Sequence, residues 1–487
     1  MPWSTWTEGS VATVLAIDAG STGVRAALFD GRGASIASAY QELAIRFPKA
    51  GWVEQDAEAV WAATAAVAAK AIEGAGRQVR IDAVAIANQR ASVVAWDGKT
   101  LEALSPLISW QDVRARERCR ELQAQGLFVT PNLAVTKLEW ILRHIPAARS
   151  AAARGRLRFG TLDSWLAAKW ASGLHVTDHA NASATGLYAH LTRGWDEQVL
   201  AAIGVDRRWL PEIVDSAGIV GSVTSGAPAA GAPLAAICGD QQASLFGLGC
   251  WARGQAKCSY GTAAMVDLNS GGEIAIGGAG TYPLVGWSLA GQATYCIEGS
   301  VITAGAAVQW LRDGLGLIEQ VADSDRLARE APEGGEVWAV PAFQGLGTPW
   351  VSSESRALIG GLSRASTGAD VARAVLEGVA HRVADVAEAV WQGSRAASAL
   401  RVDGGASRND FLMQRQADFL GLPVERGAES DGAALGVAAL AARVLGEEWD
   451  VWRLERAFEP SLSDEERERE RKRWRRRVEA LALAQLE

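Results

Sequence analysis

The chain has 487 residues, and its 48 Lys and Arg against 56 Asp and Glu give a formal net charge of −8. This length is too great for one hydrophobic core and predicts about two to four domains. With 49% hydrophobic and 21% charged residues the composition excludes a disordered chain, and the acidic balance excludes a general attraction for nucleic acid.

Metal-binding and export signals are scarce. The chain holds five His and five Cys, with neither a CxxC pair nor an HExxH sequence, which argues against a structural zinc site. Residues 1–8 lack the basic and apolar segments of a secretory signal, and no run of about 18 apolar residues occurs. We therefore expect a cytoplasmic protein without a membrane partner.

The first patterned segment predicts a β-hairpin. Apolar strands over residues 11–17 and 24–29 flank the turn Asp18-Ala19-Gly20-Ser21-Thr22-Gly23. Glycine lets backbone amides approach an anion, and the Ser and Thr hydroxyls add hydrogen-bond donors. Asp18 offers the hard oxygen ligand that Mg²⁺ prefers. The alternative is a polar turn without a ligand.

The pattern continues with a helix over 56–75 and a buried strand over 81–87 that runs into Asn88-Gln89-Arg90. Further helices are predicted over 112–124 and 133–145, with Trp110-Gln111-Asp112 opening the first. An indole ring at this place suits the apolar side of a polyol or sugar, although packing in the core is the ordinary role of tryptophan.

Residues 221–236 are rich in Gly, Ala and Pro, which favours a linker near a domain boundary. An apolar strand over 234–238 precedes Asp240, and the carboxyl ends of such strands are where α/β sheets place ligands. A carboxylate at this position suits a general base towards a substrate hydroxyl. A structural turn residue is the alternative.

The second half repeats these features. Residues 259–262 form a Gly-Thr turn after a strand, and a strand over 400–402 runs into Asp403-Gly404-Gly405, with a helix from Asn409. An apolar strand followed by Asp, Gly and Ser or Thr thus occurs at 15–22 and at 400–407. The repetition predicts duplicated α/β domains that hold one nucleotide between them.

The charged segment 464–477 surrounds Trp474 near the end of the chain. Glu465 and Arg469, like Glu468 and Lys472, lie four positions apart, a spacing that stabilises exposed helices. We expect a solvated terminal helix here.

Taken in order, the motifs resemble those of the FGGY family of carbohydrate kinases, and within it the glycerol kinases most closely. The resemblance extends from about residue 11 to residue 478. It includes Asp18-x-Gly20-Ser21-Thr22, Gly51-Trp52-Val53-Glu54-Gln55-Asp56, Asn88-Gln89-Arg90, Trp110-Gln111-Asp112, Gly239-Asp240-Gln241-Gln242, Glu298-Gly299-Ser300 and Asp403-Gly404-Gly405-Ala406-Ser407.

This resemblance implies the α/β fold of the actin-like (ribonuclease H-like) ATPases, with two related domains around a nucleotide and substrate cleft. We expect a substrate-side domain over 11–247 and a nucleotide-side domain over 248–487. ATP and Mg²⁺ are the implied cofactors. A homodimer or a homotetramer is compatible with the resemblance.

The resemblance also implies the site residues. Asp240 would be the catalytic base and Asp18 would organise the metal. The substrate would contact Arg90, Trp110, Asp240 and Gln241, and the nucleotide would contact Ser21, Thr22, Gly23, Arg25, Gly261, Thr262, Gly305, Gln309, Gly405 and Asn409.

The substrate pocket departs from the pattern of the glycerol kinases at three positions. Ala91 stands where an acidic residue is expected, Asn132 replaces a Tyr, and Met265 replaces a Phe. Loss of a carboxylate that binds hydroxyls alters specificity. We therefore expect an ATP-dependent kinase that phosphorylates a hydroxyl of a polyol or small sugar other than glycerol.

Two alternatives stay open. One is a true glycerol kinase, forming glycerol 3-phosphate, with a rearranged pocket. The other is a non-catalytic, actin-like nucleotide-binding regulator, against which the presence of both Asp18 and Asp240 argues.

Overall fold

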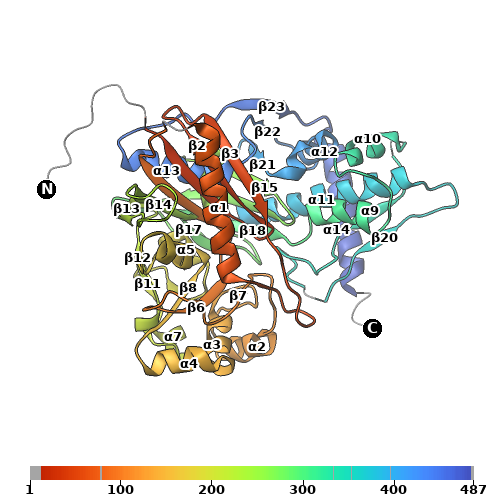
Figure 1. The fold of residues 1–487 in the computed structure, drawn as a ribbon. Helices are drawn as coiled ribbons and strands as arrows, with labels where there is room; N and C mark the ends of the chain where they lie inside the picture. Colours follow the sequence, from red (N-terminus) through yellow and green to blue (C-terminus); the bar gives the residue numbers. More distant parts are fainter. Residues whose placement is uncertain (1–11, 77–78, 333, 353, 395, 484–487) are drawn as a thin grey trace. The chain divides into compact units, whose positions relative to one another are not determined.

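The computed structural model describes residues 12–76, 79–332, 334–352, 354–394 and 396–483 (Figure 1). The N-terminal residues 1–8 and Val11, the first residue of the predicted strand 11–17, lie outside these ranges. The chain divides into two compact units. Unit 1 comprises residues up to Gly247 with 285–293 and 433–451, and unit 2 comprises 248–284, 294–432 and the residues from Trp452 onwards.

The main sheet of unit 1 has the strand order β13-β14-β5-β1-β2-β3. β1 runs antiparallel to β2 and parallel to β5, and β5 runs parallel to β14. The strands are β1 (Val14–Ala19), β2 (Gly23–Phe29), β3 (Ser35–Glu42), β5 (Ala83–Asn88), β13 (Ala217–Ser222) and β14 (Pro233–Gly239). The hairpin of β1 and β2 confirms the prediction from the Gly/Ser/Thr turn.

Helix α1 (Ala57–Ala75) lies against β2 and β3 on one face of this sheet (Figure 1). Asp56 caps its first turn by accepting hydrogen bonds from the amides of Glu58 and Ala59, which explains where the predicted helix begins. Its alanine-rich face and Val60 and Val67 belong to the core of unit 1. That core also holds Trp96, Trp165 and Trp170, which accounts for part of the high tryptophan content.

A second sheet in unit 1 has the order β4-β7-β6-β8. Its strands are β4 (Glu54–Gln55), β6 (Val93–Asp97), β7 (Leu107–Ile108) and β8 (Leu157–Thr161), and β9 (Val176–Asp178) pairs separately with β12 (Glu212–Val214). The remaining helices of the unit are α2 (Arg116–Ala124), α3 (Val135–His144), α4 (Pro146–Ala153), α5 (Leu162–Trp170), α6 (His179–Ser183), α7 (Glu197–Ile203) and α8 (Asp240–Gly247).

Unit 2 has the strand order β23-β22-β21-β15-β16-β18. Its long helix α11 covers β16 and packs on α9, α10 and α12. The strands are β15 (Ala256–Tyr260), β16 (Ala264–Gly271), β18 (Gln292–Val301), β21 (Leu400–Asp403), β22 (Val424–Gly427) and β23 (Leu454–Phe458), and the helices are α9 (Gly305–Asp313), α10 (Asp323–Glu330), α11 (Gly368–Trp391), α12 (Asp410–Leu420) and α14 (Asp464–Leu483). β17 (Tyr282–Leu289) and α13 (Gly432–Val444) each contribute residues to both units.

The two units repeat one topology, as predicted, but the equivalent segments differ from those proposed from sequence. The order β3-β2-β1-β5-β14 in unit 1 matches β18-β16-β15-β21-β22 in unit 2, with the same parallel and antiparallel pairings. The counterpart of residues 15–22 is therefore the β15–β16 hairpin. The strand that precedes Asp403 corresponds to β5, so the pairing of 15–22 with 400–407 was wrong.

Two further expectations were wrong. Residues 223–232 connect β13 to β14 as the turn of an antiparallel hairpin within unit 1, so this segment is no linker. Trp110 does not open a helix, because residues 110–111 form a turn and α2 begins only at Arg116.

The terminal helix α14 is present, but one of its faces is buried. Trp474, Val478 and Leu481 form a core cluster with Val340, Ala342 and Leu346. The indole of Trp474 stacks on His381 at a centroid distance of 4.8 Å, and its Nε1 donates to Asp385 Oδ2 at 2.9 Å. The prediction of a solvated terminal helix was therefore wrong for this face, which is packed against the rest of unit 2.

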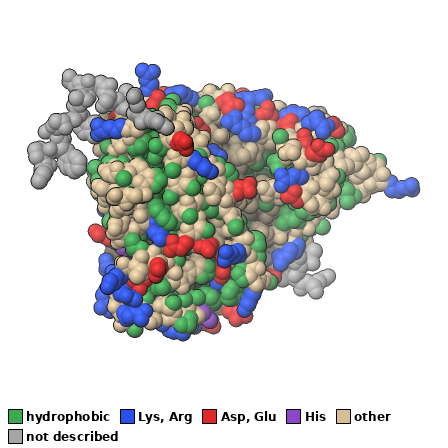
Figure 2. Space-filling view, viewed as in Figure 1, with side chains coloured by type: hydrophobic (Ala, Val, Ile, Leu, Met, Phe, Trp, Pro, Cys, Tyr) green, Lys and Arg blue, Asp and Glu red, His purple; other side chains and the backbone are tan. Residues whose placement is uncertain are grey.

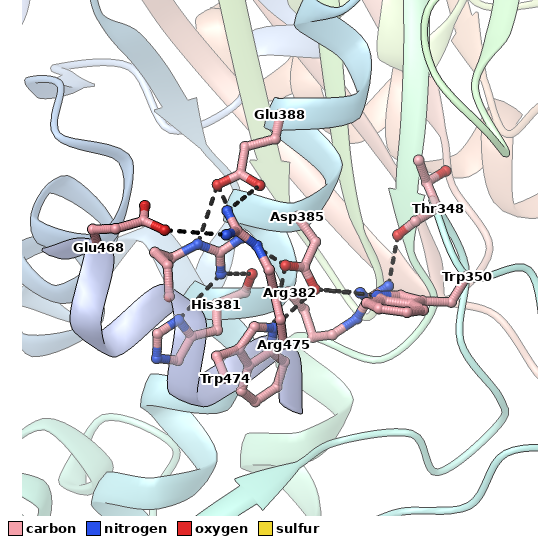
Figure 3. Close-up of polar contacts among 10 residues, drawn as sticks. Thr348, Trp350, His381, Arg382, Asp385, Glu388, Glu468, Trp474 and Arg475 are labelled. Atoms are coloured by element: carbon pink, nitrogen blue, oxygen red, sulfur yellow. Dashed lines mark hydrogen bonds and ion pairs between the residues drawn. The ribbon is translucent and has the colours of Figure 1, made fainter. Parts of the chain in front are cut away.

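The carboxylate of Asp385 fixes α14 to α11 (Figure 3). It accepts from Arg471 Nη2 at 2.6 Å and from Arg382 Nη1 at 2.7 Å, and all three side chains are buried. Burial opposes ionisation of Asp385, but the charges of Arg471 and Arg382 outweigh it and lower the pKa of the carboxyl. The pKa of His381 is held well below its usual value by burial and by Arg471, so its ring is neutral.

Substituting Trp474→Ala is expected to lower the free energy of unfolding by about 3–5 kcal/mol, because it removes a buried aromatic side chain and a donor to Asp385. The urea midpoint measures this loss. Lys472→Ala, on the exposed side of the same helix, is the control and should change stability by less than about 0.5 kcal/mol. Equal midpoints for the two variants would contradict the packing described for α14.

Candidate functional site

Three parallel strands of unit 1 end side by side. In the register of the sheet Asn88 of β5 lies opposite Ala19 of β1 on one side and opposite Gly239 of β14 on the other. The residues that follow these strand ends therefore emerge at one edge of the sheet. α/β sheets bind their ligands at this kind of edge.

The first pair of residues at this edge is Arg90 and Asp240. Arg90 Nε lies 3.3 Å from Asp240 Oδ1, and the two side chains are 10% and 24% exposed. The same carboxylate oxygen accepts the backbone amide of Gln241 at 2.8 Å. Asp240 is thus an oriented, partly accessible carboxylate at the start of α8.

Gly239 is needed for this arrangement. A Cβ at this position would lie 2.6 Å from Arg90 Cδ and 2.8 Å from Arg90 Cγ. The stem of Arg90 therefore passes directly over the glycine, and a larger residue would displace the guanidinium from Asp240.

The turn between β1 and β2 is held by a residue to which the sequence assigned no role. Gln89 is 1% exposed, and its Oε1 accepts the hydroxyls of Ser21 at 3.0 Å and Ser92 at 2.9 Å. Its Nε2 donates to Gly20 O at 3.2 Å and to Gln55 Oε1 at 2.9 Å. All four hydrogen-bonding positions of this buried amide are used, so Gln89 fixes the turn to the end of β5.

Trp110 reaches the same turn from the other side. Its Nε1 donates to the hydroxyl of Ser21 at 2.9 Å, so this hydroxyl accepts from the indole while it donates to Gln89. The predicted phosphate turn and the predicted substrate wall are therefore joined by one hydrogen-bonded hydroxyl. Thr22, next to Ser21, is exposed.

The turn that carries Trp110 is supported by Asp112. Asp112 Oδ2 accepts the amide of Val53 at 2.6 Å, and the carboxylate pairs with Arg114 at 2.7 Å. The guanidinium of Arg114 packs against the rings of Trp52 and Trp140, at 3.9 and 4.5 Å from their centroids. These contacts to distant residues hold residues 110–112 in a turn, which explains why the helix predicted from the local pattern is absent here.

Two of the three departures in the substrate pocket lie beside these groups. Ala91 is buried, with a left-handed backbone (φ 56°), directly after Arg90. Asn132 is exposed, and its Nδ2 donates to the carbonyl of Trp110 at 3.1 Å. Its own carbonyl accepts from Lys137 Nζ at 3.0 Å. Burial lowers the pKa of this lysine to about 7. Met265, the third departure, is half-buried in β16 of unit 2.

Asp18 and Arg25 are cross-strand neighbours in the β1–β2 hairpin, and both are half-buried. The Arg25 guanidinium also lies 5.7 Å from the centre of the Tyr40 ring. Gly23 is buried against that ring, without room for a side chain. A cation and a carboxylate therefore face each other beside the turn.

In unit 2 the equivalent turn contains Gly261 and Thr262, both exposed. Gly261 O accepts the amide of Gly305 at 3.0 Å, and Thr262 O accepts that of Ala306 at 3.2 Å, so the first residues of α9 are fixed to the turn. A Cβ on Gly305 would lie 2.5 Å from Gly261 O. The backbone of Gly404 (φ 85°) approaches Tyr260 equally closely.

The other predicted nucleotide residues differ in their surroundings. Gly405 is exposed after β21, and Gln309 is exposed on α9. Asn409 caps α12, because its Oδ1 accepts the amide of Leu412 at 2.8 Å while its Nδ2 donates to Ser324 Oγ at 3.0 Å. Close by, Lys257 and Asp267 form a buried ion pair at 2.9 Å.

The groups at these turns suit a nucleotide with a bound cation. Within the described ranges there is no group of three or more His, Cys, Asp or Glu that could enclose a metal ion. Mg²⁺ commonly uses one or two carboxylates together with water and phosphate oxygens. The donor set of Asp18 and a phosphate ligand meets that requirement without a dedicated cage.

We predict that the Ser21–Trp110 hydrogen bond contributes about 1 kcal/mol to the stability of unit 1. A double-mutant cycle of Ser21→Ala and Trp110→Phe, read from urea unfolding, measures this coupling. The exposed Thr22→Ala combined with Trp110→Phe is the control and should be additive within about 0.5 kcal/mol. Additive losses in the Ser21 cycle as well would show that the two side chains act independently.

Comparison with known proteins identifies the family to which both halves of the chain are similar. Residues 13–247 match the N-terminal domain, and residues 256–445 the C-terminal domain, of the FGGY family of carbohydrate kinases. The chain is 42% identical to a glycerol kinase of Dechloromonas aromatica over 473 residues, covering 93% of this chain and 94% of that protein. A glycerol kinase of Deinococcus radiodurans is 41% identical, with the same two coverages.

Solved structures agree with the fold. A glycerol kinase of Plasmodium falciparum with ADP superposes with a TM-score of 0.88 at 26% identity, covering 98% of this chain and 99% of that one. A gluconate kinase of Lactobacillus acidophilus shares the fold with a TM-score of 0.85 at 20% identity, covering 98% and 99%. The expected actin-like ATPase fold is thereby confirmed. None of the described helices is both long and apolar enough to cross a membrane.

These matches cover nearly all of the chain and contain the motifs from Asp18 to Asp403. The chain therefore belongs to the FGGY family of carbohydrate kinases, and it is an ATP-dependent kinase that acts on a hydroxyl group of a small polyol or sugar.

Proposed function

We propose that Asp240 is the general base of the phosphoryl transfer and that the acceptor is a polyol or small sugar other than glycerol. The observation that carries this proposal is the Arg90–Asp240 pair, 3.3 Å apart, at the carboxyl ends of adjacent parallel strands. This edge is where an acceptor hydroxyl would reach an oriented and accessible carboxylate.

The roles of the chain's own groups follow from phosphoryl-transfer chemistry. Asp240 accepts the proton of the acceptor hydroxyl as the hydroxyl oxygen attacks the γ-phosphorus of ATP, and the bond from that phosphorus to the departing ADP breaks. The amide of Gln241 and the guanidinium of Arg90 orient the carboxylate. Trp110 and Gln241 line the acceptor site. Positioning and charge neutralisation carry most of the catalysis in this reaction class, which agrees with a chemistry that needs neither His nor Cys.

ATP supplies the phosphoryl group. In this proposal residues of the two equivalent turns, and of the segments packed on them, are assigned to its phosphates and ribose, and Asp18 would hold Mg²⁺. The residues assigned to the nucleotide are Ser21, Thr22, Gly23, Arg25, Gly261, Thr262, Gly305, Gln309, Gly405 and Asn409. Exposure of Thr22, Gly261 and Thr262 and the close backbone approach at Gly305 support this assignment.

The proposed substrate class rests on the three departures. Ala91 ends at Cβ, where a carboxylate could have bound two hydroxyls, and the Asn132 amide is engaged with the Trp110 carbonyl. Met265 provides no aromatic wall. These changes favour a longer polyol or a small sugar over glycerol. A glycerol kinase is the second candidate, and it is favoured by relatives of that name at 42% and 41% identity.

The proposal includes the organisation of the chain. We place the boundary between a substrate-side domain (11–247) and a nucleotide-side domain (248–487) after Gly247. A cytoplasmic location is supported by the five cysteines, all of which are buried and none of which forms a disulfide bond. A homodimer or a homotetramer stays a proposal from the family resemblance.

A coupled ADP-release assay over glycerol, tetritols, pentitols and ketoses tests the substrate class. We expect kcat/KM for one of the longer acceptors to exceed that for glycerol by about tenfold or more. Ala91→Glu should shift this ratio back towards glycerol, because it restores an acceptor for hydroxyl hydrogens. Glycerol as the best substrate of the wild type would establish the second candidate instead, and ADP release indifferent to every acceptor would contradict both.

A further inference from the structure

A basic pocket lies beside the terminal helix of unit 2. Its volume is about 460 Å³, within the range of small-molecule sites. β19 (Trp338–Val340) supplies Trp338 and α14 supplies the rest of the lining. The lining residues are Trp338, Arg469, Lys472, Arg473, Arg476, Arg477 and Ala480.

The α14 face that lines this pocket is held by the burial of the opposite face. Arg471, Trp474 and Val478 are buried, and Arg471 donates to Asp385 Oδ1 at 2.6 Å and to the carbonyl of His381 at 3.0 Å. The helix therefore cannot rotate without breaking this network. The basic side chains project from a rigid element, as a preorganised site requires.

The cations of α14 outside the pocket have carboxylate partners. Arg467 pairs with Asp464 at 2.8 Å, Arg471 with Asp385, and Arg475 with Glu388 at 3.4 Å. Figure 3 shows the last of these together with Glu468.

Most of the cations that line the pocket, in contrast, have no such carboxylate partner among the described residues. Of its five basic residues Arg473 is paired, with Glu470 at 3.5 Å. In the part of the chain that the structure describes, no carboxylate lies within ion-pair distance of the other four, which are Arg469, Lys472, Arg476 and Arg477. The positive charge of α14 is thus concentrated on the face that lines the pocket.

This concentration opposes folding of the helix. Arg469 and Arg473, Lys472 and Arg476, and Arg473 and Arg477 are like-charged pairs four positions apart, which destabilise a helix. Burial and the neighbouring Arg473 lower the pKa of the Arg477 guanidinium, and the charges of Glu470 and Glu377 offset this only in part. The guanidinium lies 4.9 Å from the centre of the Trp338 ring. A bound anion would remove this repulsion.

We propose that the pocket binds a small anion that carries at least two phosphate groups. Four of its five cations are arginines, whose planar guanidinium groups bind phosphate with two parallel hydrogen bonds. They extend over about 12 Å of helix between residues 469 and 477, a span that exceeds one phosphate group. The indole of Trp338 supplies an apolar wall for an organic part of the ligand.

A small ligand is favoured over a nucleic acid by the overall charge of the chain. The chain carries a formal charge of −8. On the face shown in Figure 2, acidic and basic side chains are interspersed, so a long polyanion lying across that face would meet carboxylates as well as cations. The pocket itself is confined to one helix face and one indole.

Calorimetric titration of the full chain with inorganic pyrophosphate in Mg²⁺-free buffer tests the proposal. Arg476→Glu should weaken binding about tenfold or more, since it replaces a pocket cation by a carboxylate. Arg364→Glu is the matched control, because Arg364 is an exposed residue in the loop before α11 that does not line the pocket, and it should bind as the wild type does. Orthophosphate should bind more weakly than pyrophosphate.

Three results would overturn the proposal. One is equal pyrophosphate affinity in the wild type and both variants. The second is loss of all pyrophosphate binding in Arg25→Glu, a variant of the candidate nucleotide site in unit 1, together with wild-type binding in Arg476→Glu, which would place the anion in that site. The third is tighter binding of a single-stranded oligonucleotide than of pyrophosphate, which would assign the surface to a macromolecule.

Arg476→Glu removes repulsion within α14, so the melting temperature of this variant should equal or exceed that of the wild type.

Discussion

The alignment of three parallel strands is the constraint on which the candidate site of unit 1 depends. Asn88 lies in register with Ala19 and Gly239, and this single alignment brings together the residues after β1, β5 and β14. It places Arg90 beside Asp240 and lets Gln89 bind the turn of the hairpin. A shift of one residue in β5 would reverse which side chains face the core and separate these groups.

Buried polar contacts keep this edge in place. The amides of Asn88 and Asn181 bond reciprocally at 2.9 and 3.1 Å, and Asp178 accepts the backbone amide of Asn181 at 2.8 Å. On the other side, Arg114 packs against Trp52 and Trp140 and pairs with Asp112, which supports the turn of Trp110. Four of the 20 tryptophans serve packing in this way: Trp96, Trp165 and Trp170 in the core of unit 1 and Trp474 in unit 2.

Sequence patterns correctly predicted the elements that neighbouring residues determine. They failed where contacts between residues distant in the sequence determine the structure. The hairpin after Asp18 and the strand before Asp240 were predicted because alternation and turn residues encode them directly. The turn at Trp110 was taken for the start of a helix, since nothing local indicates that Asp112 bonds Val53, 59 residues away. The burial of α14 depends likewise on a partner 86 residues from Arg471. Duplication of the units was recognised, but only the strand order identified their equivalent segments.

The most direct test of the account is acceptor-dependent ADP release by Asp240→Asn, measured beside Asp206→Asn, a surface carboxylate of unit 1 that pairs with Arg208. Loss of the general base should lower kcat for transfer by a factor of about 10²–10⁴. Affinity for ATP and the urea midpoint should stay near those of the wild type, and Asp206→Asn should retain full turnover. An Asp240→Asn enzyme that phosphorylates its acceptor at the wild-type rate would contradict the assignment of Asp240 as the base.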